Sequence, residues 1–214
     1  MPVDVKICGI SEARHAHAAA RFGARWLGFV FFPPSPRHLT IEVATALAPQ
    51  LPAGVKRVGV FVNASDDLLK AATKALKLDA VQLHGRESPE DVARIKAMLG
   101  VRIIKAVGVS TEADIETAAA YADSTDHILF DAKPPKGAIL PGGNAARFPW
   151  HILGGKNLGY KWMLAGGLTA ENAAEAIAAS GASALDISSG VEVAPGKKSS
   201  VLIEGFLTAV KAVK

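Results

Sequence analysis

The sequence has a single cysteine and no long apolar run. One Cys among 214 residues excludes an intramolecular disulfide framework and is typical of a reducing compartment. No run reaches the ~18 consecutive apolar residues that a membrane-spanning helix needs, so we expect no membrane partner. The first residues also lack the charged and apolar blocks of a signal peptide. Together these absences predict a cytoplasmic protein.

Aromatic residues are scarce, and neither sign of charge dominates. Phe, Trp and Tyr make up 6% of the chain, and 24 basic against 20 acidic residues give a net charge of +4. A nucleic-acid-binding face would interleave basic and aromatic residues, whereas the lysines here are scattered. We therefore expect no nucleic-acid partner, and the mild positive bias favours a small anionic ligand. Half of the residues are hydrophobic, which is enough for a folded core.

Short β-branched or aromatic runs alternate with Ala-rich amphipathic stretches along the chain. This pattern predicts eight strands, each followed by a helix. No interior linker rich in Ser, Gly or charge interrupts it, so we expect one domain over residues 1–214. The predicted strands lie near 3–8, 26–31, 56–62, 79–84, 102–107, 127–131, 160–165 and 183–188, and the predicted helices near 11–22, 41–48, 65–77, 88–98, 111–122, 149–154, 169–179 and 200–213.

Eight strand–helix units in a row favour parallel pairing with right-handed crossovers. The strands begin at intervals of roughly 23–33 residues, close to the division of a small (β/α)8 barrel. A doubly wound open sheet would also alternate, but it usually has fewer strands and a phosphate-binding loop after the first. Here Cys8-Gly9-Ile10-Ser11 follows the first strand, without a G-x-G-x-x-G pattern. The sequence therefore predicts an α/β fold, a single-domain (β/α)8 TIM barrel.

Two connections are longer than the rest, and both follow the carboxyl end of a strand. They span residues 32–38 and 133–144. Barrels of this kind carry their chemistry at that end, so we expect the two loops to be mobile covers over a site. The alternative is tolerated surface insertion.

Strand periodicity places polar residues on the inward face of the predicted barrel. Barrel closure makes the eighth strand a neighbour of the first, so we predict a buried ion pair between Lys6 and Asp186, because an isolated buried ion is costly. The alternative is that one of the two contacts substrate or water. The inward polar residues are Asp4, Lys6 and Cys8, then Gln82 and His84, then His127 and Asp131, and finally Asp186 and Ser188.

Cys8 and Asp131 are the candidate catalytic residues. Lys6 and a following helix N-terminus can lower the pKa of the Cys8 thiol, and a thiolate can act as nucleophile or general base. Asp131 would face it across the barrel mouth, and a base and an acid on opposite sides of a ligand suit a proton-moving reaction such as isomerisation. The alternatives are a small buried hydrophobe for Cys8 and a loop cap for Asp131.

Two glycine-containing loops follow the last two strands and predict a phosphate site. Glycines let backbone amides approach an anion closely, and the loops after strands seven and eight are the habitual phosphate site of this fold. The alternative is that these glycines serve tight turns. The residues concerned are Gly166, Gly167, Ser188, Ser189 and Gly190.

Arg37 and His84 complete the predicted binding site. The Arg37 guanidinium could grip a carboxylate in a two-pronged manner, with Phe31 or Phe32 packing an apolar ring; the alternative is a solvated arginine. No second inward histidine lies at the right end, so we interpret His84 as part of the site wall and expect no metal.

These residues lie in an ordered set of motifs that closely resembles the phosphoribosylanthranilate isomerase family of (β/α)8 enzymes in the tryptophan pathway. The resemblance covers nearly the whole chain. The motifs are Lys6-Ile7-Cys8-Gly9-Ile10, Gly28-Phe29-Val30-Phe31 with Ser35-Pro36-Arg37, Val58-Gly59-Val60-Phe61-Val62-Asn63, Val81-Gln82-Leu83-His84-Gly85, Leu129-Phe130-Asp131, Leu164-Ala165-Gly166-Gly167-Leu168 and Asp186-Ile187-Ser188-Ser189-Gly190-Val191-Glu192.

The resemblance implies an Amadori rearrangement of N-(5-phosphoribosyl)anthranilate to 1-(2-carboxyphenylamino)-1-deoxyribulose 5-phosphate, the third step from chorismate, without metal or cofactor. It implies that Asp131 is the general acid and Cys8 the general base, that Arg37 holds the anthranilate carboxylate, and that the loops at Gly167 and 188–190 hold the phosphate. The loop after Asp131 departs from the family's Gly-Gly-Thr-Gly, so we carry over no contact from residues 132–145. We expect a monomer or a homodimer.

Other phosphosugar barrels are the nearest alternatives. Indoleglycerol-phosphate synthase would need inward catalytic Lys and Glu, the histidine-pathway isomerase an Asp in place of Cys8, and a metal-dependent epimerase several histidines. A protein that only binds phosphate-bearing ligands or RNA is the alternative from another class, and its basic and aromatic residues would share one face.

Overall fold

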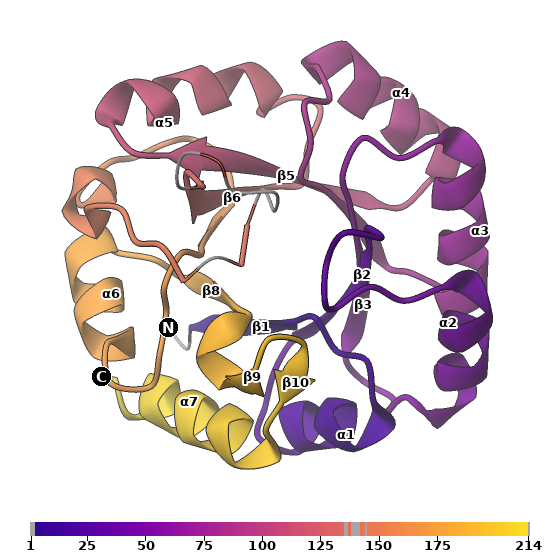
Figure 1. Cartoon of the computed structure of the whole chain (residues 1–214). Helices are drawn as coiled ribbons and strands as arrows, with labels where there is room; N and C mark the ends of the chain where they lie inside the picture. The colour runs from indigo at the N-terminus through magenta and orange to yellow at the C-terminus, as the bar shows by residue number, and fades with distance from the viewer. Residues whose placement is uncertain (1–2, 135–136, 138–141, 144, 214) are drawn as a thin grey trace.

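The computed structural model describes residues 3–134, 137, 142–143 and 145–213. In this part of the chain eight parallel strands form a closed barrel in the order β1 to β8, and β1 pairs with both β2 and β8. Helices surround the ring of strands on the outside (Figure 1). The predicted α/β fold, a (β/α)8 TIM barrel, is confirmed.

The strands and helices alternate as the hydrophobic pattern predicts. The strands are β1 (Asp4–Cys8), β2 (Trp26–Phe31), β3 (Lys56–Phe61), β4 (Ala80–Leu83), β5 (Arg102–Val109), β6 (His127–Ala132), β7 (Trp162–Leu164) and β8 (Ala184–Ile187), and the α-helices are α1 (Ala13–Arg21), α2 (Ile41–Leu47), α3 (Asp66–Leu76), α4 (Pro89–Leu99), α5 (Glu112–Ala118), α6 (Ala173–Ser180) and α7 (Ser200–Ala212).

Two helix predictions differ from the structure. The helix expected at 149–154 is a short 3-10 turn, η3 (Trp150–Leu153). The helix expected at 169–179 begins at Ala173, because the Asn172 side chain accepts from the Thr169 N–H and donates to the Gly167 carbonyl. This side chain closes a non-helical turn in place of the first helical turn.

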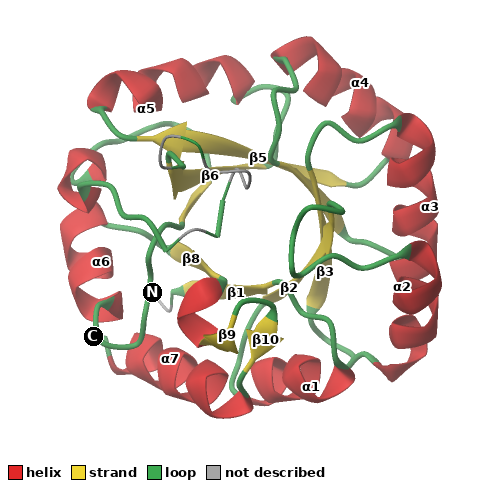
Figure 2. Cartoon of the chain, viewed as in Figure 1, coloured by secondary structure: helices red, strands yellow, loops and turns green. Residues whose placement is uncertain are grey.

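The connection between β8 and α7 contains structure that the sequence pattern does not predict. A 3-10 turn, η4 (Ser189–Val191), leads into a hairpin of β9 (Glu192–Ala194) and β10 (Lys197–Lys198). The hairpin lies next to α7 and the end of β1 (Figure 2). Its strands are too short for a period-2 pattern to reveal them.

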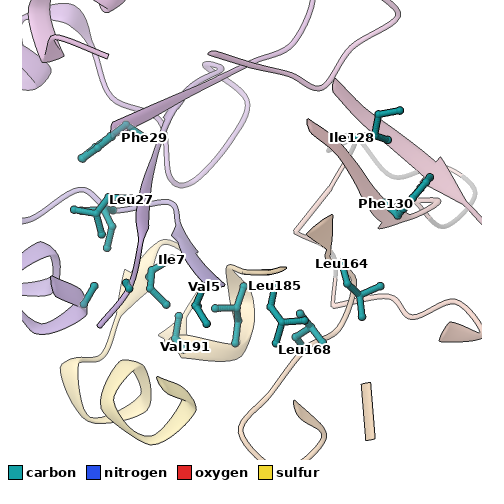
Figure 3. Packing of buried hydrophobic residues seen from close by; sticks show 14 of the residues in the cluster. Val5, Ile7, Leu27, Phe29, Ile128, Phe130, Leu164, Leu168, Leu185 and Val191 are labelled. Carbon is teal, nitrogen blue, oxygen red and sulfur yellow. The ribbon is translucent and has the colours of Figure 1, made fainter. Parts of the chain in front are cut away.

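Side chains alternate between the inside and the outside of the barrel. Val5, Ile7 and Phe130 are buried in the large cluster between the strands and the helices (Figure 3). Leu129 belongs to a separate cluster inside the barrel, with Met163 and residues of other strands. This is the alternation predicted for the first and sixth strands, and it directs Lys6, Cys8 and Asp131 inward.

No helix in the described part of the chain is both long and apolar enough to cross a membrane.

A buried ion pair fixes the loop that follows β4. Lys105 lies between two inward residues of β5, so its side chain points out of the barrel, where Nζ donates to Glu87 Oε2 at 2.9 Å and to the Gly85 carbonyl at 2.8 Å. Glu87 in turn accepts from the backbone N–H groups of Asn63 and Gly85. Both charged side chains are almost fully buried. The pair therefore holds the backbone directly after His84 in one conformation.

Removing one member of this pair should be far more costly than removing an exposed ion pair. We expect Lys105→Met to lower the free energy of unfolding by about 3–5 kcal/mol, because Glu87 is left buried without a counter-charge. Lys56→Met, which breaks the exposed Lys56–Asp79 pair, should cost less than about 1 kcal/mol. Urea unfolding measures both. Equal losses in the two variants would contradict this account. The double variant Lys105→Met/Glu87→Gln should be more stable than Lys105→Met alone, and no such recovery would also contradict it.

Candidate active site

A pocket opens at the carboxyl ends of the strands. It encloses ≈ 830 Å³, including the part that is open to solvent. Its wall combines inward strand residues with the loops after β2, β6, β7 and β8. Eight of the nine predicted site residues line it: Cys8, Arg37, His84, Asp131, Gly166, Gly167, Ser188 and Ser189.

The predicted ion pair between Lys6 and Asp186 is present at the floor of this pocket. Lys6 Nζ lies 3.0 and 3.1 Å from the two carboxylate oxygens of Asp186, which is its register partner on β8. Burial opposes the charge on Lys6, but the neighbouring Asp186 and Cys8 outweigh it and hold the pKa of Lys6 above its ordinary value. Lys6 is fully buried, whereas Asp186 also lines the pocket.

Cys8 lies beside this ion pair because position 28 is glycine. A Cβ atom at Gly28 would lie 2.9 Å from Cys8 Sγ and 3.0 Å from Lys6 Nζ, closer than packed side chains allow. Burial raises the pKa of the Cys8 thiol, although the positive charges of Lys6 and Lys198 act in the opposite direction. The expectation of a lowered thiol pKa was therefore wrong, since burial of the thiolate outweighs the nearby cations.

Asp131 ends β6 with its carboxyl group in the pocket wall. Its Oδ1 accepts the N–H of Ala132 at 2.8 Å. Burial, followed by the negative charge of Asp186, raises the pKa of Asp131 to about 7. A carboxyl group with this pKa keeps its proton to near neutral pH, which suits a general acid.

His84 lies next to Asp131, and both groups are neutral in slightly acidic solution. Burial, together with the charges of Lys105 and Lys6, lowers the pKa of His84 to about 3. The 3.6 Å between His84 Nε2 and Asp131 Oδ2 is therefore a contact and not an ion pair. On its other side, His84 Nδ1 lies 3.2 Å from Gln82 Nε2. Among the described residues no group of three His, Cys, Asp or Glu is arranged to hold a metal ion.

Arg37 is held by a carboxylate of the chain itself. Its Nε and Nη2 donate to Glu192 at 2.7 and 2.8 Å, and Lys198 Nζ donates to the same carboxylate at 2.6 Å and to the Ser188 carbonyl at 2.9 Å. The interpretation of Arg37 as a solvated side chain is excluded, since it is 6% exposed. No described residue accepts from Nη1 or from the second proton of Nη2, so this end of the guanidinium can donate to a ligand carboxylate.

Sequence reasoning missed Glu192 and Lys198 as part of the site. Both belong to the β9–β10 hairpin, and the Lys198 side chain is fully buried. Glu192 ends one of the motifs that carry the family resemblance, and the Pro195-Gly196 turn indicates a hairpin, but neither signal gives the direction of either side chain.

The two phenylalanines at the end of β2 have different surroundings. Phe31 points out of the barrel and stacks on Phe61 with ring centroids 5.2 Å apart. Phe32 is partly buried and lines the pocket together with Val30 and Val60. Of the two predicted ring-packing residues, only Phe32 can contact a ligand.

The predicted phosphate loops lie side by side in the pocket wall. Gly166 and Gly167 have φ of +91° and +64°, conformations that favour glycine. Within the described part of the chain, neither of their N–H groups donates a hydrogen bond, and both residues line the pocket. Gly190 does not line the pocket; it packs closely against the Leu168 carbonyl, where a Cβ atom has no room. Its role is to bring the two loops together.

Part of the loop after β6 contacts the candidate acid. A Cβ atom at Gly142 would lie 2.5 Å from Asp131 Oδ2 and 2.7 Å from His84 Cε1, so a larger residue there would displace the Asp131 carboxyl group or the His84 ring. Residues 135–136, 138–141 and 144 of this loop lie outside the described residues.

Comparisons with known proteins agree with this geometry. A family model described as N-(5'phosphoribosyl)anthranilate (PRA) isomerase matches residues 5–209. The N-(5'-phosphoribosyl)anthranilate isomerase of Paramagnetospirillum magneticum is 49% identical over 99% of this chain and 98% of its own. The crystal structure of phosphoribosyl anthranilate isomerase from Thermotoga maritima has a TM-score of 0.87 at 39% identity and covers 98% of each chain. A solved structure of such an isomerase in complex with reduced 1-(o-carboxyphenylamino)-1-deoxyribulose 5-phosphate has a TM-score of 0.84 at 37% identity over 98% of each chain.

The raised pKa of Asp131 predicts that its charge destabilises the fold. Its pKa is 3.8 in a free side chain and about 7 in the folded chain, so the folded state binds a proton that the unfolded state has lost between these values. Stability is therefore lost as the pH rises from about 4 to about 7. Asp131→Asn does not titrate and keeps an oxygen for the Ala132 N–H. We expect the free energy of unfolding of Asp131→Asn, relative to that of the native chain, to rise by about 2–4 kcal/mol as the pH increases from 4 to 8.

Urea unfolding at several pH values measures this difference. Asp186→Asn is the matched control, and it should lose stability at pH 8 because Lys6 is left buried without its partner. A constant difference between Asp131→Asn and the native chain at all pH values would contradict the raised pKa.

Proposed function

The chain belongs to the N-(5'-phosphoribosyl)anthranilate isomerase family, and on this basis we propose how its pocket carries out the family's reaction. The chain catalyses the isomerisation of N-(5-phosphoribosyl)anthranilate to 1-(2-carboxyphenylamino)-1-deoxyribulose 5-phosphate in tryptophan biosynthesis. The reaction opens the ribose ring and moves hydrogen from C2 to C1, so it needs an acid and a base on one ligand. One observation carries the assignment of roles: Cys8 and Asp131 line one pocket together with Arg37 and the glycine loops.

The substrate occupies the pocket with its two anionic ends in two different groups of side chains and amides. The phosphate binds at Gly166, Gly167 and the loop that begins at Ser188, where backbone amides can donate to its oxygens. The anthranilate carboxylate binds at the end of the Arg37 guanidinium, and its ring packs on Phe32. Glu192 supports this arrangement because it holds the guanidinium plane in place. The ribose is then centred over the pocket floor.

Asp131 starts the reaction as the general acid. It transfers its proton to the ring oxygen of the ribose, the bond between this oxygen and C1 breaks, and the nitrogen lone pair forms a C=N bond. The open-chain product of this step is an iminium ion. A pKa of about 7 supports the role, because the carboxyl group still carries its proton near neutral pH.

Cys8 completes the reaction as the general base. Its thiolate removes the C2 proton, the C2–H electrons form a C1=C2 bond, and the iminium electrons return to nitrogen. The resulting enolamine loses its hydroxyl proton and gains one at C1 to give the ketone. The substrate and product are isomers, so no other reactant is consumed.

The positions of the two protons set the working form of the site. The reaction needs a proton on Asp131 and none on Cys8, whereas burial raises the pKa of both groups. Near neutral pH the Cys8 thiol of the free pocket keeps its proton, and the Asp131 carboxyl group keeps its own in a large share of the molecules. The working form retains the carboxyl proton and has lost the thiol proton, and the adjacent Lys6 charge lowers the free energy of the thiolate.

Genetic complementation tests the reaction itself. Expression of the chain should restore growth without tryptophan to a bacterial strain that lacks this isomerase and retains the rest of the pathway. Immunoblotting confirms that the protein is present. Absence of growth with a well-expressed, folded chain would overturn the assignment. A strain that also requires histidine provides the control for general effects on growth, because this second requirement should remain when the chain is expressed.

Substitution of the two candidate residues tests their roles. We expect Cys8→Ala and Asp131→Asn each to lower kcat by about 10²–10⁴-fold or more, because each removes a general acid or base. Calorimetry with the reduced product analogue should show affinity close to that of the native chain, and circular dichroism should show intact folds. Turnover near the native rate in either variant would refute the role of that residue.

A further inference from the structure

Gln82 is a buried amide that the mechanism above does not use. It belongs to β4, points into the barrel and is 1% exposed. It lines the pocket two residues before His84, on the same inward face. Its register partners are Val60 on β3 and Ile104 on β5, which have no polar side-chain atoms. A polar side chain in such surroundings lowers stability unless its hydrogen bonds are formed.

Only one end of this amide has a partner in the described part of the chain. Gln82 Nε2 lies 3.2 Å from His84 Nδ1, whereas Oε1 is buried and accepts no hydrogen bond. An unpaired buried acceptor lowers stability, because its desolvation is not compensated. Such an oxygen in a pocket wall indicates a donor on the ligand.

The orientation of the amide determines where His84 carries its proton. With Nε2 facing Nδ1, the imidazole accepts at Nδ1 and carries its proton on Nε2, the atom 3.6 Å from Asp131 Oδ2. The reversed amide would bury two N–H donors without acceptors. Orphan N–H groups are rarer in proteins than orphan carbonyl oxygens, which favours the orientation observed.

We infer that Gln82 is a positioning and specificity residue that acts at both ends of its amide. Its Nε2 holds His84 as the Nε2–H tautomer facing the candidate acid Asp131, and its Oε1 accepts a hydrogen bond from a ribose hydroxyl of the substrate. The inference rests on the proposed function, since it assigns a task to groups around that acid.

The tautomer matters at the moment when Asp131 loses its proton. Oδ1 is committed to the Ala132 N–H, so the transferable proton and the developing charge belong to Oδ2. A His84 Nε2–H donor stabilises that charge, whereas a lone pair on Nε2 would compete with the ribose for the same proton. Gln82 therefore keeps His84 from acting as an acceptor.

Nuclear magnetic resonance of the native chain tests the tautomer directly. In protein labelled with 15N at histidine, protonated and lone-pair ring nitrogens give widely separated signals, and the spectrum of His84→Asn assigns the His84 pair. We expect a neutral imidazole with its proton on Nε2 at pH 7. A proton on Nδ1 or a charged ring would overturn the inference. This result does not depend on turnover, so it separates the inference from the proposed function.

Kinetics of Gln82→Met test what the amide does. We expect kcat to fall about 10- to 100-fold, a fraction of the ~10²–10⁴-fold that a general acid contributes. The control is Thr73→Val on α3, which removes a buried hydroxyl that has no partner among the described residues and is not part of the pocket lining. Both variants should unfold at urea concentrations no lower than the native chain. A folded Gln82→Met variant with kcat within twofold of the native value would overturn the inference.

His84 variants and ligand affinity separate the two ends of the amide. His84→Gln can place an amide N–H near the position of Nε2, and His84→Asn cannot. The kcat of His84→Gln should therefore be at least about tenfold higher than that of His84→Asn, and equal rates would count against the tautomer.

Ligand affinity tests the role of Oε1. Gln82→Met should raise the Kd for the reduced product analogue about tenfold, the equivalent of one ordinary hydrogen bond, whereas Thr73→Val should leave it unchanged. An unchanged Kd in Gln82→Met would overturn the contact to the ribose.

Discussion

The ion pair between Lys6 and Asp186 is the interaction on which the rest of the site depends. It joins the first and last strands of the barrel at the floor of the pocket, where neither charge could remain without the other. Its positive end lies beside Cys8, and its negative end helps to raise the pKa of Asp131. This ion pair thus adds a side-chain link to the backbone pairing of β1 with β8 and places a positive and a negative charge at the pocket floor.

Buried carboxylates also pair with buried cations elsewhere around the pocket. Glu192 holds Arg37 and Lys198, and Glu87 holds Lys105 behind the loop that follows His84. In each case the chain supplies the counter-charge, so the cation is fixed before any ligand arrives. This pre-organisation lowers the cost of ordering side chains when the substrate binds.

The barrel could be predicted from the sequence because predicted strands and helices alternate regularly along the chain. The Lys6–Asp186 contact could be predicted because closure of the barrel makes β1 and β8 neighbours. It could not predict the partner of Arg37, since Glu192 lies on a three-residue strand whose direction depends on the Pro195-Gly196 turn. The raised pKa of Cys8 was equally hidden. In the sequence, Lys6 and the expected helix N-terminus argue for a lowered pKa, and only the depth of burial, a property of the assembled barrel, decides the sign.

The scarcity of cysteine has a practical consequence. Cys8 is the chain's only thiol, and it lies in the wall of the pocket. A thiol-specific label on the folded protein therefore reports on this one place without any engineered mutation. Its slow attachment would measure how often the pocket admits the reagent, and protection by a bound molecule would measure occupancy.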